Sequence, residues 1–139
     1  MRIAHAPSRV ERQPRAVAIG TFDGVHLGHR AIVGAAVATG LAATVITFDP
    51  HPRVALGNQV ELISTLERRL ELLGEAGAET VLVASFTPEL MRLEPEEFVR
   101  SYLQAIGAEA VVVGEDFRFG KGRAGDLAWL LWLLLEARY

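Results

Sequence analysis

Two histidines stand three residues apart in a glycine-rich stretch near the N-terminus, Ile19-Gly-Thr-Phe-Asp-Gly-Val-His-Leu-Gly-His29. At positions i and i+3, His26 and His29 would share one face at the start of a helix. The free N–H groups and the dipole of a helix start favour phosphate. Imidazole donors there suit phosphoryl or nucleotidyl transfer, in which charge redistributes over phosphate oxygens. We therefore predict a phosphate site with His26 and His29 as its catalytic residues.

The residues around this pair fit the same chemistry. Gly20 and Gly28 allow close backbone approach to a ligand, and Arg30 adds a positive charge, although an arginine at this point can also be simply solvated. A lone histidine near a helix start is usually structural, but the H-x-G-H pair directly after a strand and a glycine turn favours function. A zinc site is the weaker alternative, because His5 and His51 have no spacing that argues for a third ligand.

A second unusual loop is Thr47-Phe-Asp-Pro-His-Pro52. Its two prolines predict a stiff, extended segment. Phe48 with Pro50 and Pro52 could form an apolar wall for a planar ring. The alternative interpretation is an ordinary rigid turn.

A third loop reads GEDFRFGKGRAGD and combines aromatic, cationic and acidic residues. Phe117 and Phe119 could stack on a heterocycle, and Lys121 and Arg123 could bind a phosphate. Asp116 could accept a hydrogen bond or help to hold a metal ion. The alternative is a long solvated loop that the two phenylalanines anchor.

The elements that must position these loops read as alternating strands and helices. Continuous apolar runs predict buried strands at Ala16–Ile19, Ala43–Phe48, Thr80–Phe86 and Glu109–Val113. Helices are predicted from about His26 to Thr39 with Gly40 as stop, from a Ser64–Glu67 capping box to Gly77, from Pro95 to Gly107, and from about Gly125 onward. Arg68 and Arg69 read as a solvated helix face. The alternation predicts βαβ units whose ligand lies beyond the carboxyl ends of the strands, where all three loops fall.

Composition limits the remaining possibilities. A chain of 139 residues, half of them hydrophobic, fits one domain spanning residues 1–139. The net charge of −3 argues against a general nucleic-acid surface, and the absence of cysteine fits a cytoplasmic protein. The longest apolar run, Leu127–Leu135, falls short of the roughly 20 residues that cross a bilayer, so no membrane partner is expected.

Together the segments IGTFDGVHLGHR, TFDPHP, LEPEEFV and VVVGEDFRFGKGRAGD resemble the prokaryotic FAD synthetase family in its FMN adenylyltransferase module. The match runs in order and spacing from about Ala16 to Asp126. H-x-G-H alone would indicate only a broad nucleotidyltransferase superfamily. GTFDGVHLGH together with GEDFRFGKGRxGD is far more specific.

The resemblance implies a Rossmann-like α/β fold with a parallel sheet of the H-x-G-H nucleotidyltransferase type. It also implies the reaction FMN + ATP → FAD + pyrophosphate, with Mg²⁺. The implied site residues are His26 and His29 on the ATP phosphates; Gly20, Phe22, Asp23, Gly28 and Asp116 in the ATP pocket; Pro50, Pro52, Phe117 and Phe119 on the flavin; and Arg30, Lys121 and Arg123 as further phosphate contacts.

The sequence departs from the family pattern at its C-terminal end. The family's module continues past the equivalent of Tyr139 with another strand and an I-S-S-T-x-x-R-like phosphate clamp, usually followed by a riboflavin kinase module, and neither occurs in these 139 residues. We therefore expect an incomplete sheet, impaired activity and self-association through an uncovered sheet edge. Two alternatives stay open: a non-catalytic flavin- or nucleotide-binding fragment, and another H-x-G-H nucleotidyltransferase with a different acceptor.

Overall fold

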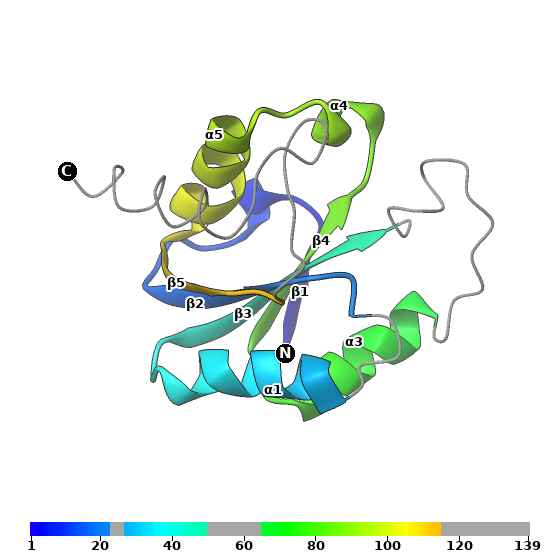
Figure 1. Cartoon of the computed structure of the whole chain (residues 1–139), viewed down its shortest axis with the longest axis vertical. Coiled ribbons are helices and arrows are strands. Elements are labelled where there is room, and N and C mark those ends of the chain that lie inside the picture. Colours follow the sequence, from blue (N-terminus) through cyan, green and yellow to red (C-terminus); the bar gives the residue numbers. More distant parts are fainter. Residues whose placement is uncertain (23–26, 50–64, 115–139) are drawn as a thin grey trace.

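The computed structural model describes residues 1–22, 27–49 and 65–114 (Figure 1). Its centre is an all-parallel sheet with the strand order β1-β4-β3-β2-β5. The strands are β1 (Arg2–Ala4), β2 (Arg15–Ile19), β3 (Ala42–Asp49), β4 (Thr80–Ser85) and β5 (Ala108–Val112). The four predicted strands are confirmed, each to within one residue at either end. Strand β1 was missed, because three residues are too few to show a hydrophobic pattern.

Both faces of the three central strands, β2, β3 and β4, are buried, which explains their continuous apolar runs, whereas β5 at the edge of the sheet is only partly buried. Along β2, Ala16 and Ala18 face one core cluster, while Val17 and Ile19 face the other. Helices α1 (Leu27–Ala38) and α3 (Leu66–Glu75) cover the face of Ala16 and Ala18. Helices α4 (Pro88–Met91) and α5 (Pro95–Phe98), with the turns that continue α5, cover the opposite face (Figure 1).

The helix ends carry the expected signals with one exception. Helix α1 gives way to Gly40, whose φ of 79° is the left-handed conformation that glycine adopts most easily. Helix α3 is capped by Thr65 rather than by Ser64, so the predicted capping box is wrong. The Thr65 side chain accepts a hydrogen bond from the backbone N–H of Arg68 at 3.1 Å. Two neighbouring hydroxyl residues can both cap a helix, and the sequence does not distinguish them.

The helix predicted from Pro95 is confirmed, but its winding changes along its length. After α5 it continues as a π-helical turn, η2 (Val99–Leu103), and a 3₁₀ turn, η3 (Gln104–Ile106). The short elements η1 (Pro7–Arg9) and α4 were not predicted. The helix predicted from Gly125 lies outside the described residues. In the described part of the chain, no helix is long and apolar enough to cross a membrane.

A buried arginine ties the amino ends of the central strands together. Arg15, at the start of β2, is only 2% exposed. Its guanidinium donates to Thr44 Oγ1 of β3 at 3.0 Å, to Thr80 Oγ1 of β4 at 3.4 Å and to the carbonyl of Ile106 at 3.1 Å. Burial lowers the pKa of Arg15, and the neighbouring Glu11 and Glu79 oppose that shift. The cation is therefore held by hydrogen-bond acceptors on several elements at once.

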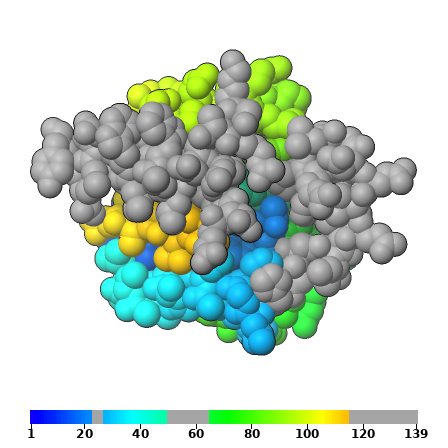
Figure 2. Space-filling model, viewed as in Figure 1, coloured from blue at the N-terminus to red at the C-terminus, as the bar shows by residue number. Residues whose placement is uncertain are grey.

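The strand order places a topological switch at β2. The chain leaves β2 through α1 to reach β3 on one side, and later returns to β5 on the other side. In open α/β sheets, ligands bind in the crevice that opens at the carboxyl end of such a strand. The turn that follows β2 begins at Gly20, so the first of the three predicted loops starts at this position. The α/β, Rossmann-like prediction is confirmed. Figure 2 shows α1, in blue to cyan, at the surface beside β5, in orange.

Substitution of Gly107 tests the turn that brings the chain back into β5. Its φ is 90°, and an added Cβ would lie 2.2 Å from the carbonyl oxygen of Gln13. Gly107→Ala should lower the free energy of unfolding by more than about 1 kcal/mol. Gly34→Ala, in α1, should instead raise it by up to about 1 kcal/mol, because beyond its chain neighbours and its own helix backbone no atom lies within 4 Å of the added Cβ. Urea unfolding followed by circular dichroism measures both, and equal effects would contradict this account.

Candidate functional site

The turn after β2 is fixed by hydrogen bonds to β3. The N–H of Gly20 donates to the carbonyl of Ile46 at 3.1 Å, which prolongs the pairing of the two strands. One residue later, the hydroxyl of Thr47 donates to the carbonyl of Thr21 at 2.9 Å. The carboxyl end of β3 thereby sets where the chain leaves β2 and in which direction it turns.

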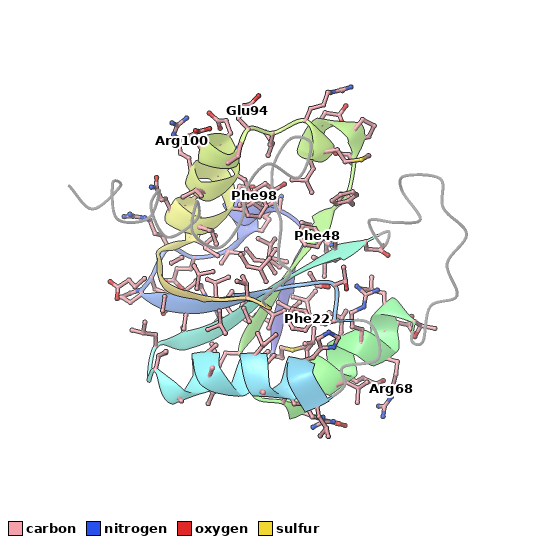
Figure 3. All side chains as sticks on the ribbon, in the orientation of Figure 1. Phe22, Phe48, Arg68, Glu94, Phe98 and Arg100 are labelled. Carbon is pink, nitrogen blue, oxygen red and sulfur yellow. The ribbon has the colours of Figure 1, made fainter. Side chains whose placement is uncertain are left out.

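Phe22 occupies an unusual conformation at this turn. Its φ is 56°, and it is the one residue other than glycine with positive φ among the described residues. Its ring is completely buried in the core beneath α1 and α3, together with Val33 and Leu73 (Figure 3). A side chain at Gly20 would lie 3.2 Å from this ring, so glycine leaves the space that the ring fills. Burial of the aromatic ring offsets the cost of the backbone conformation.

His29 lies directly against this anchor. It belongs to the first turn of α1 and is half-buried, with Nδ1 shielded from solvent. The ring centroids of Phe22 and His29 are 5.2 Å apart, and the two planes meet at 69° in an edge contact. Gly28 and Arg30, on either side of His29, are exposed. The histidine is thus held by the core, while its neighbours remain accessible at a helix start that favours anions.

The structure brings five of the predicted site residues to this turn: Gly20, Phe22, Gly28, His29 and Arg30. Phe22 is fully buried, so its ring can act on the site only through what packs on it. The other predicted residues lie outside the described residues: Asp23, His26, Pro50, Pro52, Asp116, Phe117, Phe119, Lys121 and Arg123. Phe48, expected beside the prolines, is buried in the core and makes an edge contact with Phe86 at 5.7 Å.

Sequence reasoning missed Arg69, which is 1% exposed. Its guanidinium donates to Thr47 Oγ1 at 3.1 Å and to the carbonyl of Phe48 at 2.9 Å. The prediction of a solvated face is therefore wrong for Arg69, although it is correct for Arg68. Arg68 points away from the sheet (Figure 3) and pairs with Glu71 at 2.7 Å, with both side chains more than half exposed.

A signal for the burial of Arg69 was present in the helix periodicity. Arg69 lies three residues after Leu66 and four before Leu73, on the apolar face of α3. The charge of Arg69 favoured the prediction of a solvated side chain, whereas its position on the apolar face of α3 indicates a buried one. Burial puts a fixed positive charge beneath the carboxyl ends of β2 and β3, at the end of the sheet where a ligand is expected.

The described residues contain no group of three His, Cys, Asp or Glu that could hold a metal ion. At the carboxyl edge these residues include the imidazole of His29, the first turn of α1 and the guanidinium groups of Arg30 and Arg69, together with the carboxylate of Asp49 at the end of β3. The imidazole, the helix start and the cations suit phosphate oxygens, because each supplies a hydrogen-bond donor or a positive charge.

The neighbouring arginines of α3 offer a matched stability test. Arg69→Met removes the donor to Thr47 Oγ1 and to the carbonyl of Phe48 inside the core, and we expect a loss of about 1–3 kcal/mol in the free energy of unfolding. Arg68→Met breaks only an exposed ion pair and should change it by less than about 0.5 kcal/mol. Urea unfolding of both variants decides, and similar losses would show that the buried hydrogen bonds contribute little.

Comparison with known proteins places the chain in a family. The family model described as FAD synthetase matches residues 8–134. Over 124 residues the chain is 41% identical to the bifunctional riboflavin kinase/FMN adenylyltransferase of Listeria monocytogenes, covering 82% of this chain and 40% of that protein. It is 35% identical over 136 residues to a FAD synthetase of the same organism, covering 91% of this chain and 55% of that protein. The chain thus spans about half or less of the length of these relatives.

A solved structure shares the fold. The crystal structure of a macrolide-efflux protein from Streptococcus pneumoniae superposes with a TM-score of 0.80, covering 94% of this chain and 46% of that chain. At 24% identity this likeness concerns the fold alone. The family match over nearly the whole chain carries the assignment: the chain belongs to the FAD synthetase family.

Proposed function

We propose that this chain catalyses the adenylyl-transfer step of FAD synthesis, FMN + ATP → FAD + pyrophosphate, as a single domain of residues 1–139. One observation carries the proposal. In a chain of the FAD synthetase family, the turn at the topological switch presents His29 against a buried Phe22, beside the exposed start of α1. That position is where open α/β sheets bind nucleotides.

The reaction requires little covalent chemistry from the protein. A phosphate oxygen of FMN attacks the α-phosphorus of ATP in line, the bond from that phosphorus to the bridging oxygen of the β-phosphate breaks, and pyrophosphate leaves with the electron pair. The protein holds the two phosphates in line and stabilises charge on the oxygens. His29 and His26 donate hydrogen bonds to phosphate oxygens in the transition state, and the backbone N–H groups near Gly28 help to hold the triphosphate.

Further residues complete the proposed site. Gly20, Asp23 and Asp116 lie on the ATP side, and Phe22 shapes that side through its contact with His29. The flavin ring is bound by four apolar residues, Pro50, Pro52, Phe117 and Phe119. Arg30, Lys121 and Arg123 supply positive charge for phosphate.

Mg²⁺ would enter the site with ATP and would supply positive charge for the triphosphate. The protein's own contribution is to orient the phosphates. A cytoplasmic location and self-association through a sheet edge remain predictions from the sequence.

The proposal is tested by incubating the purified chain with FMN, ATP and Mg²⁺ and measuring FAD by chromatography. His29→Ala and His26→Ala should each lower the initial rate by about 10²–10³-fold, since each removes a preorganised donor. Arg68→Met, which changes only an exposed ion pair on α3, serves as control and should retain the wild-type rate.

Three outcomes would contradict the proposal. Equal FAD formation by wild type and His29→Ala would remove His29 from the reaction. Folded wild-type chain that binds FMN or ATP without forming FAD would be a binding domain, and transfer to a different acceptor would indicate another H-x-G-H transferase.

A further inference from the structure

We propose that Thr47 and Arg69 are positioning residues, which hold the turn after β2 so that Phe22 orients the imidazole of His29. The consequence for catalysis rests on the proposed adenylyl transfer, whereas the effect on His29 itself does not. Neither Thr47 nor Arg69 is among the site residues predicted from the sequence.

Each hydrogen bond of the Thr47 hydroxyl has only one possible direction. A guanidinium can only donate, so Thr47 Oγ1 must accept from Arg69 at 3.1 Å. The single hydroxyl proton of Thr47 is then left for the carbonyl of Thr21, at 2.9 Å. A second bond from Arg69, to the carbonyl of Phe48 at 2.9 Å, keeps the guanidinium in place. The side chains of Thr47 and Arg69 are both buried, and their mutual hydrogen bond lies in the core, where its electrostatic contribution is larger than in water.

These hydrogen bonds also constrain the backbone at Phe22. The carbonyl of Thr21 belongs to the peptide unit that joins Thr21 to Phe22. Holding its oxygen therefore orients the peptide plane from which φ of Phe22 is measured. That φ is 56°, a region that residues other than glycine seldom adopt and that persists only where the surroundings determine it. The hydroxyl of Thr47 is one such determinant.

The ring of Phe22 in turn contacts the imidazole of His29. The two rings meet edge to face at 5.2 Å, so a change in the backbone of Phe22 would move the surface on which the imidazole rests. In-line transfer depends steeply on alignment, and displacements of about 1 Å can cost 10²-fold in rate. The chain Arg69–Thr47–Thr21–Phe22 thus connects α3 to a proposed catalytic residue on α1 without contacting substrate.

Two substitutions at Thr47 separate the hydroxyl from the shape of the side chain. Thr47→Val keeps the branched shape but neither accepts nor donates, whereas Thr47→Ser keeps the hydroxyl. We expect Thr47→Val to lower kcat for FAD formation by about 10- to 100-fold, with a smaller change in KM for ATP. Thr47→Ser should stay within about 3-fold of wild type in kcat. Equal effects of the two variants would overturn the proposal.

A spectroscopic measurement without substrate keeps the inference separate from the reaction. The imidazole proton signals of His29, assigned with His29→Ala, sense the ring of Phe22 in NMR spectra, and the exposed His5 serves as internal reference. Thr47→Val should shift the His29 signals and leave those of His5 unchanged, while Thr47→Ser should match wild type. If Thr47→Val does not fold, Arg69→Lys, which keeps the charge but not the planar fork, is expected to shift His29 in the same way.

The outcomes are distinguishable. Unchanged His29 signals in a folded Thr47→Val or Arg69→Lys variant would overturn the positioning role, whatever the activity. Absence of FAD formation by wild type together with shifted His29 signals would overturn the proposed function and leave the positioning of His29 established.

Discussion

The carboxyl end of this sheet depends on a guanidinium buried in its core. A buried cation is costly unless its N–H groups find acceptors, so its hydrogen bonds constrain every element that supplies one. Arg69 reaches from α3 to β3, and the hydroxyl of Thr47 extends the connection to the turn after β2. The position of the turn is therefore tied to a helix that follows it by more than forty residues.

A second buried arginine links several elements at the amino end of the sheet. Arg15 joins β2, β3 and β4 at their amino ends through the hydroxyls of Thr44 and Thr80, and it also reaches the carbonyl of Ile106. The two ends differ in what the buried cation holds. Arg15 ties together three neighbouring strands, whereas Arg69 and Thr47 hold the start of the turn after β2, at the carboxyl end where sheets of this kind bind ligands. The hydrogen bonds at the amino end support the fold, and those at the carboxyl end also support the proposed site.

Much of the fold followed from local patterns in the sequence. The apolar runs of β2, β3 and β4 are those that parallel strands buried on both faces require. The helix stops at Gly40, Gly77 and Gly107 all have positive φ. Strand β1 carries too few residues to show a period, and its pairing with β4 is a long-range property. The cap at Thr65 was misplaced because adjacent hydroxyls are equivalent in sequence.

The sequence predicted the site residues that belong to a motif, but not those that tertiary packing brings together. The glycine-rich H-x-G-H segment led to His29 and to its place at the switch of the sheet. The burial of Phe22, its positive φ and the hydrogen bonds of Thr47 and Arg69 arise from residues that are distant along the chain. Each of these residues would be unremarkable alone: a phenylalanine, a strand threonine, a helix arginine.

The pairing of Gly20 with Phe22 shows why such a turn needs several residues to agree. A glycine alone would make the turn flexible, because it adopts many backbone conformations at similar free energy. A phenylalanine alone would not adopt a φ of 56° without compensation. Here the missing side chain of Gly20 makes room for the ring, burial of the ring holds the strained backbone, and the hydroxyl of Thr47 fixes the peptide between them. Under the proposed mechanism, the ring of Phe22 orients His29 before substrate binds, which is the condition under which a hydrogen-bond donor contributes most to a transition state.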